Sequence, residues 1–343
     1  MKGRILEAAS VDVCASVQAA APTVQLWRRH FSDADEQAAC VPAMFPQRYD
    51  QVSCGRFTGE MASVDLDGVV ILRERANQRL LQAGATPQLS LLWTLNSTSR
   101  YRCNGVYLNP CSIMLNCPGN PFEIQSDPSE MIAMTISQRT LTDSMSCGLE
   151  YPPPVPGVRV VPPSLAAVLR VAVTTVLAVV DSGTPNLACG SWFRSRRDEL
   201  VQLAMMVAEL PNPHKDQRRC ERTYVRVVHS ACALLKRDTT GSLAISELCR
   251  RVGVSRRNLH YAFDAVLGMT PGHYLRSVRL NAVRRSIKGR SSAFNTVAEL
   301  ASQSGFYHPS RFTAEYKRQF GELPSQTARN ATLASALAAD PRT

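Results

Sequence analysis

Two short stretches of the chain carry side chains that can form hydrogen bonds to the edges of nucleic-acid bases. Each stretch opens an expected helix, so its side chains fall on the first turns of that helix. Arginine can bind guanine through two parallel N–H groups, and serine or histidine can reach a base or a phosphate. The eight outward positions are Arg256, Arg257, His260 and Tyr261, and then His308, Ser310, Arg311 and Ala314. We predict that these positions face the major groove of double-stranded DNA.

The charge distribution favours the same partner. The whole chain carries a formal net charge of +11, but the charge is unevenly distributed. Residues 211–343 contain 22 Lys and Arg against 9 Asp and Glu, whereas residues 1–210 contain 17 Lys and Arg against 19 Asp and Glu. A basic excess confined to one part of a chain indicates a polyanionic partner. The residues that we predict to contact phosphates are Arg276, Arg284, Arg285, Lys288, Lys317 and Arg318.

A helix–turn–helix pattern surrounds each of the two stretches. In the second, Thr296 and Glu299 form a capping box, Gly305 permits a sharp turn, and Pro309 opens the next helix. Phe312 and the aromatic residues that follow it at intervals of four share one apolar face. The same pattern predicts a tight pair of helices with a small, polar and basic N-terminal turn left outside.

The first unit lies about fifty residues earlier and follows the same rules. Its first helix is expected at roughly 245–252, Gly253 makes the turn, and Ser255 caps the second helix. Between the units, residues 271–289 predict one continuous helix of roughly 25 Å. Such a spacer would hold two recognition helices close to one DNA turn apart.

The N-terminal half has a different pattern of apolar and turn-forming residues. Residues 1–45 show no clear period and are expected to form a poorly defined arm. From about Phe57 to Ile136, short apolar segments broken by Gly, Pro, Asn and Asp predict a β-sandwich or barrel. Helical patterns follow at 137–149, 163–180 and 191–210, the second with Ser164 at the N-cap position. After the N-terminal arm, we divide the chain into a β-rich domain at 46–210, a linker at 211–222, a DNA-binding domain at 223–327 and a tail at 328–343.

The β-rich half offers little chemistry of its own. Only His30 of the six histidines precedes the linker, so we expect no cupin-type metal centre, and the chain contains no nucleophile elbow, Walker loop or dinucleotide-binding loop. We therefore expect no catalytic residues, no metal and no cofactor. Four aromatic residues are candidates for an organic-ligand pocket, although core packing is the alternative: Trp93, Tyr101, Tyr107 and Phe122.

The cysteines and the apolar segments bear on where the protein works. Eleven cysteines, an odd number without C-x-x-C pairs, favour reduced thiols, and the N-terminus lacks the pattern of a secretory signal. The most apolar run, residues 171–180, is too short to cross a bilayer. We expect a cytoplasmic protein that does not enter a membrane.

The C-terminal residues resemble a known family. The segments RLNAVRRSIKG and VAELASQSGFYHPSRFTAEYKRQFGELPSQ resemble the C-terminal signature of the AraC/XylS family of bacterial transcription regulators, and the resemblance covers residues 223–327. It implies a double helix–turn–helix domain. The matching positions are Leu280, Ala282, Ala301, Gly305, Phe306, Phe312, Phe320, Gly321 and Pro324.

The resemblance also implies DNA-reading positions, at Arg257, His260 and Tyr261 in the first unit and at Pro309, Ser310, Arg311 and Ala314 in the second. The chain departs from the family pattern at Pro309 and Ala314, where other members often have polar or basic residues. Readout by the second unit is therefore expected to depend on Ser310 and Arg311.

The N-terminal half, at residues 49–74, is similar to the ethanolamine operon regulator subgroup of that family. This similarity implies a sensor of a small effector, with ethanolamine and adenosylcobalamin as the effectors of the named member. It rests on scaffold residues such as Gly55, Phe57 and Arg73, so it indicates shared architecture before a shared ligand.

The sequence thus predicts an α+β multidomain protein with a cupin-like β-sandwich or barrel, following helices, and an all-α double helix–turn–helix domain. Its predicted function is that of a sequence-specific transcription regulator, an activator, which senses an effector or dimerises through its N-terminal half. Its predicted partners are promoter DNA, RNA polymerase, a small effector and a second copy of the chain. The alternative is a ligand-binding or enzymatic β-domain whose basic helical tail binds RNA or an acidic protein.

Overall fold

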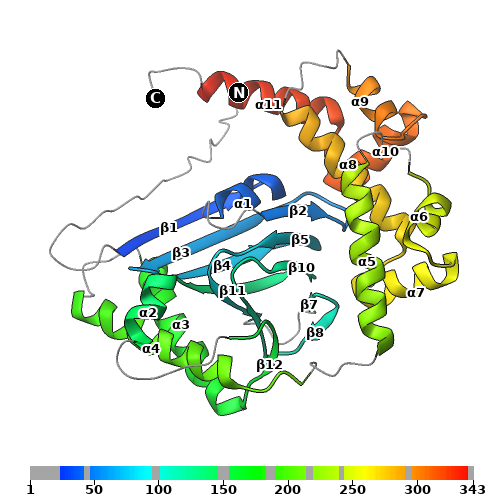
Figure 1. Ribbon diagram of the computed structural model, residues 1–343. Coiled ribbons are helices and arrows are strands. Elements are labelled where there is room, and N and C mark those ends of the chain that lie inside the picture. Colours follow the sequence, from blue (N-terminus) through cyan, green and yellow to red (C-terminus); the bar gives the residue numbers. More distant parts are fainter. Residues whose placement is uncertain are drawn as a thin grey trace.

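Strands fill the first half of the chain and helices fill the second (Figure 1). The computed structural model describes residues 24–41, 47–94, 101–145, 154–182, 190–213, 219–238, 243–289 and 296–338. Within these ranges the strands form one seven-stranded and one five-stranded sheet, all pairings being antiparallel. The α+β class is confirmed, whereas the cupin-like form of the β-rich part stays a prediction.

The seven-stranded sheet has the order β1-β3-β4-β11-β6-β9-β12 and the five-stranded sheet the order β2-β5-β10-β7-β8. The strands of the first sheet are β1 (Val24–Phe31), β3 (Gly59–Leu66), β4 (Val69–Ala76), β11 (Ser129–Ile136), β6 (Leu89–Thr94), β9 (Ser112–Asn116) and β12 (Gly157–Val160). Those of the second are β2 (Gln47–Gln51), β5 (Leu80–Ala85), β10 (Pro121–Ser126), β7 (Tyr101–Cys103) and β8 (Val106–Leu108).

Both faces of the seven-stranded sheet are covered. Ile71 and Met134, paired across β4 and β11, belong to a core with α3 (Pro163–Ser182) and α4 (Gly190–Glu209). The opposite face packs on the five-stranded sheet, for example where Leu92 meets Phe122. Because both faces are buried at the centre of the sheet, β4 opens with the unbroken apolar run of residues 69–72, and all six residues of β6 are buried. Helix α2 (Gln138–Met145) follows β11 directly, and α3 begins at Pro163, so Ser164 lies inside the helix and is not its N-cap as predicted.

The stretch expected to be a poorly defined arm contributes two elements. β1 pairs along its length with β3, and α1 (Ala34–Cys40) begins at Asp33, whose carboxylate accepts hydrogen bonds from the N–H groups of Asp35 and Glu36 at 2.9 and 3.2 Å. β1 is an edge strand with mostly exposed or half-buried residues. An edge strand needs no strict apolar alternation, which is why its sequence shows no period.

The helical half consists of seven helices among the described residues. They are α5 (Arg219–Arg237), α6 (Ile245–Val252), α7 (Arg256–Leu267), α8 (Pro271–Lys288), α9 (Val297–Gln303), α10 (Pro309–Phe320) and α11 (Pro324–Ala338). α5 therefore begins inside the expected linker, and α11 extends into the expected tail.

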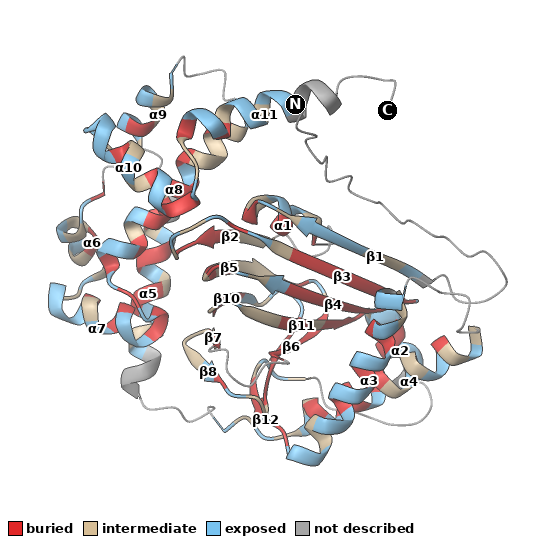
Figure 2. Ribbon diagram, turned by 180° about the vertical axis from the view of Figure 1, so that it is seen from behind, coloured by how far each residue is buried: buried red, intermediate tan, exposed pale blue. Residues whose placement is uncertain are grey.

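Helix α8 belongs to both cores of this half. Its N-terminal part, with Tyr274 and Val278, packs into the core of α5, α6 and α7, and its C-terminal part, with Val283 and Ile287, packs into the core of α9, α10 and α11. Figure 2 shows the buried residues of these helices turned inward and exposed residues on the outer surfaces of α6, α7, α9 and α10. Two small helical cores are thus held together by one helix of 18 residues, about 27 Å long.

Candidate nucleic-acid interface

The first helix–turn–helix unit consists of α6 and α7. Gly253 ends α6 in the left-handed conformation, with φ of 74°, and the Ser255 hydroxyl accepts a hydrogen bond from the N–H of Asn258 at 3.1 Å at the start of α7. Leu259, Ala262, Phe263 and Val266 are buried, as the stripe predicted.

Opposite that stripe, α7 presents its predicted base-reading positions to solvent. Arg256, Arg257 and Tyr261 are exposed and His260 is half-buried. The Arg257 guanidinium lies over the Tyr261 ring, 5.4 Å from its centroid, and donates to the phenol oxygen through Nε and Nη2 at 3.1 and 3.0 Å. The first unit therefore presents an arginine supported by an aromatic ring.

The second unit consists of α9 and α10. Both hydrogen bonds of the predicted capping box are present at 3.2 Å, since the Thr296 hydroxyl accepts from the Glu299 N–H and the Glu299 carboxylate accepts from the Thr296 N–H. Gly305 has a φ of 84° at the turn, and Pro309 is the first residue of α10. Local chemistry alone thus specifies both ends of this turn.

Aromatic packing fixes the buried side of α10. Phe312 contacts Tyr316 with ring centroids 5.7 Å apart, and Tyr316 contacts Phe320 at 4.7 Å. The positions predicted to read bases lie on the other side and are all exposed: His308, Ser310, Arg311 and Ala314.

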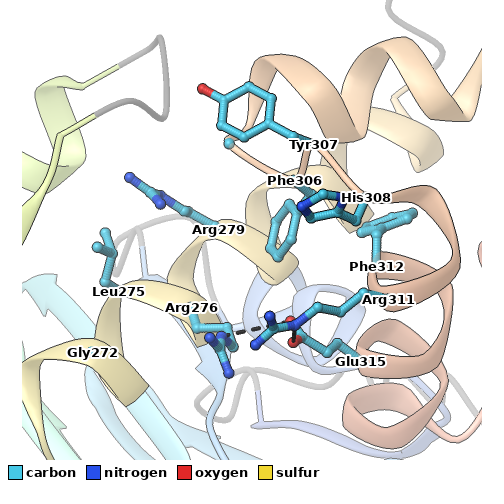
Figure 3. A pocket seen from close by; sticks show the side chains of 11 residues that line it. Gly272, Leu275, Arg276, Arg279, Phe306, Tyr307, His308, Arg311, Phe312 and Glu315 are labelled. Carbon is cyan, nitrogen blue, oxygen red and sulfur yellow. Dashed lines mark hydrogen bonds and ion pairs between the residues drawn. The ribbon is translucent and has the colours of Figure 1, made fainter.

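A cleft of about 320 Å³ lies between α8 and the turn that leads into α10, as Figure 3 shows. Arg276 and Arg279 of α8 line it from one side, and His308 and Arg311 from the other. Glu315 lies between them. Its carboxylate accepts from Arg311 Nε at 2.9 Å and lies 3.6 Å from Arg276 Nε. Glu315 was not among the residues selected from the sequence, although its position four residues after Arg311 was a signal for an ion pair on one helix face.

Three of the predicted phosphate contacts have half-buried side chains that are paired with carboxylates of the protein. Arg284, Arg285 and Lys288, in the last turns of α8, contact the N-terminal half instead. Arg284 pairs with Asp33 at 2.9 Å and with Glu322 at 2.7 Å. These side chains engage carboxylates of the protein in this structure, and their role as phosphate contacts stays a prediction.

The other two cations complete the same contact. Arg285 pairs with Asp35 at 2.6 Å and Asp50 at 2.7 Å, and Lys288 pairs with Asp33 at 2.7 Å and with Glu36 at 3.0 Å. We call these four carboxylates and three cations the α8 dock: Asp33, Asp35, Glu36, Asp50, Arg284, Arg285 and Lys288. The acidic run at the start of α1 was visible in the sequence, but its partners lie some 250 residues away.

Burial sets the electrostatics of the α8 dock. Burial by itself raises the pKa of Asp33, but the neighbouring positive charges of Arg284 and Lys288 outweigh it and hold the pKa below its ordinary value of 3.8. For Arg284, burial alone lowers the pKa, but the charge and hydrogen bond of Asp33, together with the charges of Tyr316 and Glu322, raise it above its ordinary value. Asp33 and Arg284 thus hold each other in the charged form, whereas burial raises the pKa of Asp35 above its ordinary value of 3.8 despite the charge of Arg285.

Uncharged hydrogen bonds extend the dock toward α10. The Asn281 amide donates to the Gln51 carbonyl at 2.9 Å and accepts from the Gln51 N–H at 3.1 Å. Gln319 of α10 donates to the same carbonyl at 2.6 Å, and the Gln51 amide donates to the Gln319 carbonyl at 2.7 Å. The end of β2 is thereby tied to both helices.

The remaining phosphate candidates are accessible. Arg276, Lys317 and Arg318 have exposed side chains. These three stay predicted phosphate contacts.

The four aromatic residues predicted to line one pocket do not meet. Trp93 is buried with the helix-covered face of the seven-stranded sheet, whereas Tyr101 and Phe122 are buried between the two sheets. Tyr107 is 54% exposed and stacks on Arg102, 4.1 Å from the ring centroid. The prediction of a shared pocket is wrong, because consecutive strands place these residues on different faces; core packing, the alternative, accounts for Trp93, Tyr101 and Phe122.

A small cavity of about 30 Å³ does lie between the sheets. Its walls are mainly apolar and include Leu92 and Phe122. Three of its lining residues have a buried oxygen without a hydrogen-bond partner, namely Gln47 Oε1, Ser90 Oγ and Thr135 Oγ1. Buried oxygens without partners are uncommon, and this group indicates a place for a water molecule or a polar ligand group.

The described residues contain no group of three or more His, Cys, Asp and Glu side chains placed to hold a metal ion. None of their helices is both long and apolar enough to span a bilayer.

Comparison with known proteins concentrates on the helical half. Residues 248–330 match a family described as a helix-turn-helix domain. A probable thc operon regulatory protein of Rhodococcus erythropolis is 35% identical over 103 residues, which are 30% of this chain and 31% of that protein. The XylDLEGF operon transcriptional activator 1 of Pseudomonas putida is 33% identical over 107 residues, 31% of each chain. This chain thus spans less than a third of the length of either relative.

Among solved structures, the AraC-like transcriptional activator CuxR is similar with a TM-score of 0.40 and 14% identity, over 76% of this chain and 96% of that one. Residues 248–330 are thus a helix-turn-helix domain, and the sequence relatives support the resemblance to the AraC/XylS family. Their names are those of regulators and not of enzymes, in agreement with the sequence prediction. The similarity of the N-terminal half to the ethanolamine subgroup stays a prediction.

Proposed function

We propose that the protein is a transcription regulator of the AraC/XylS type that reads DNA sequence through α7 and α10. The observation that carries this proposal is the pair of helix–turn–helix units joined by α8, each of which presents an arginine on the exposed first turns of its second helix. An arginine in that position can read guanine in the major groove. The two units would bind successive parts of one asymmetric site.

The proposal is tested by selecting duplexes from a fragmented genome with the full chain and sequencing them. The full chain is required because the α8 dock joins the two halves. We expect an enriched asymmetric motif with two half-elements about one turn, or 10 base pairs, apart. Binding to every duplex and to RNA with the same salt dependence would instead favour a basic helical tail without sequence readout.

We extend the proposal to activation, since the Pseudomonas relative is named as an activator. An activator of this type would contact RNA polymerase while bound to its promoter in the cytoplasm. Transcription from a selected promoter with purified polymerase tests this step, and repression by the protein would contradict it. We also propose that the protein dimerises. Light scattering of the free protein at several concentrations tests this proposal.

A small effector is the finer part of the proposal. Its site would be the cavity between the sheets, whose lining residues include three with a buried oxygen that has no hydrogen-bond partner. The lining contains no carboxylate to pair with an ammonium group, so we propose a neutral, mainly apolar effector with a hydrogen-bond donor in preference to an ethanolamine-like one. The cavity must widen to admit it, since about 30 Å³ is roughly a tenth of the volume of a small pocket that holds an organic ligand.

Thermal unfolding with a panel of small alcohols, amides and amines tests the effector. A ligand that binds the folded protein raises the melting temperature, and the rise grows with the logarithm of the ratio of ligand concentration to Kd. Stabilisation by ethanolamine alone would reverse the choice of ligand class. Loss of the effect in Thr135→Val, with the fold unchanged, would place the ligand in this cavity.

A further inference from the structure

We propose that Glu315 is a positioning residue that sets the base preference of Arg311. The inference rests on the proposed function, because it concerns how α10 reads DNA. It assigns a role in recognition to a carboxylate that does not itself face the expected groove.

The geometry of one hydrogen bond carries the argument. Arg311 is 66% exposed, whereas Glu315 is 11% exposed, so the carboxylate lies beneath the guanidinium and not beside it in solvent. Glu315 Oε1 accepts from Arg311 Nε at 2.9 Å. The contact uses the inner nitrogen and leaves both outer nitrogens of Arg311 available for O6 and N7 of a guanine.

The carboxylate is itself held from a second helix. Glu315 Oε2 lies 3.6 Å from Nε of Arg276, which belongs to α8 (Figure 3). α8 is anchored in turn by the packing of both helical cores and by the α8 dock. The direction of Arg311 is therefore fixed by the tertiary structure, and less side-chain freedom has to be lost when DNA binds.

The negative charge of Glu315 lowers the affinity of the protein for DNA of any sequence. A carboxylate in the middle of a DNA-facing helix repels the phosphates of any duplex, whatever its sequence. Glu315 thus weakens binding to all DNA while it favours the duplex that offers Arg311 a guanine. A residue of this kind gives specificity by penalising the wrong partner.

A purely structural role makes a different prediction. If Glu315 only joined α10 to α8, its loss would lower stability and would weaken binding to all duplexes alike. The two roles are separated by the ratio of affinities for matched and mismatched duplexes, because a structural role leaves that ratio unchanged.

The experiment uses the full chain, its selected duplex, single base-pair variants of that duplex and a random duplex. The base pair read by Arg311 is first identified as the one where Arg311→Ala loses discrimination. Glu315→Gln is then compared with the wild type, with Arg311→Ala and with the double variant. Glu247→Gln is the matched control, because Glu247 of α6 also joins two arginines, Arg250 and Arg251, each at 2.7 Å, away from the cleft.

We expect Glu315→Gln to lose about tenfold of its discrimination at that base pair and to bind the random duplex about two- to fivefold more tightly. Glu247→Gln should keep its discrimination. In the double variant, discrimination should equal that of Arg311→Ala alone, because Glu315 acts through Arg311.

Unchanged discrimination in Glu315→Gln would overturn the inference, as would an additive loss in the double variant. Either result would leave the proposed function intact, since the wild type would still select a sequence. Failure of the wild type to select any sequence would overturn both.

Discussion

The two helix–turn–helix units share a backbone design and differ in what surrounds it. Each has a glycine at its turn and an arginine on the first turns of its second helix. In the first unit, Arg257 is supported by Tyr261 of the same helix, whereas Arg311 is supported by Glu315, which also contacts α8. The first arrangement is local to one helix, and the second couples base readout to the rest of the protein.

The units also differ in how they meet the N-terminal half. Among the described residues, the first unit does so through apolar packing, with Val52 in its core, and through a hydrogen bond from Arg102 to the Asp264 carbonyl at 2.9 Å. The second unit is held directly by the hydrogen bonds between Gln51 and Gln319, and indirectly by the α8 dock, which fixes the C-terminal part of α8 on which its core packs. Charged contacts between buried groups tolerate little displacement, so the position of the second unit is more closely tied to the β-rich half.

The largest expected effect comes from breaking the dock. Arg284→Ala leaves Asp33 and Glu322 without this partner and removes a guanidinium that lies 4.6 Å from the Phe320 ring centroid. We expect a loss of about 3–5 kcal/mol in the free energy of unfolding, measured by urea denaturation of the full chain. Arg102→Ala, the corresponding change at the first unit, should cost about 1 kcal/mol. Equal losses of unfolding free energy in the two variants would contradict the view that the two units are attached differently to the N-terminal half.

A pH dependence follows from Glu74, which lies beneath α1. Burial raises its pKa from 4.5 to about 7, despite hydrogen bonds from Gln37, Tyr49 and Gln82. The unfolded chain releases this proton near pH 4.5 and the folded chain near pH 7. Stability is therefore lost as the pH rises between these values, by on the order of 3 kcal/mol.

Glu74→Gln should flatten that part of the profile, measured as the melting temperature from pH 5 to pH 8. Because Gln37 belongs to α1, which carries most of the acidic side of the dock, we expect amide exchange in α10 to rise with pH more than in α7. Parallel profiles for the wild type and the variant would show that another group titrates. Asp33 behaves in the opposite way, since its lowered pKa gives stability that is lost only as the pH falls below its ordinary value of 3.8.

Base readout by the two arginines gives the third effect. Arg257→Ala and Arg311→Ala should each weaken binding to the selected duplex by about 1–3 kcal/mol, and binding to a random duplex far less. Lys317→Ala should weaken binding to all duplexes alike and reduce the salt dependence. Competition binding at two salt concentrations separates these cases. An equal loss on random DNA would show that the arginines contact only phosphates.

The smallest effect is expected at Tyr261. Tyr261→Phe keeps the ring under Arg257 and removes only the hydroxyl that accepts its hydrogen bonds. We expect less than about 1 kcal/mol in affinity for the selected duplex, because a neutral phenol orients a guanidinium less strongly than a carboxylate does. If Tyr261→Phe lost more affinity for the selected duplex than Glu315→Gln, Tyr261 would orient its arginine more strongly than Glu315 does.

Much of the helical half was determined by the sequence itself. The capping box of α9, the Ser255 cap of α7, the Gly253 turn and the start of α10 at Pro309 all have the predicted form. Each depends on residues within a few positions of one another, so short-range rules are sufficient. The same rules identified the buried stripes of α7 and α10 and hence the exposed positions opposite them.

Only the tertiary structure decided what the charges of α8 do. Arg284, Arg285 and Lys288 have the same sequence signature as phosphate contacts, because a cation attracts a carboxylate and a phosphate alike. Their partners at Asp33, Asp35 and Asp50 are about 235 to 250 residues away, and no local pattern connects them. The sequence could not show on which face of a sheet each of the four aromatic residues lies, because that depends on how the strands pair across whole sheets.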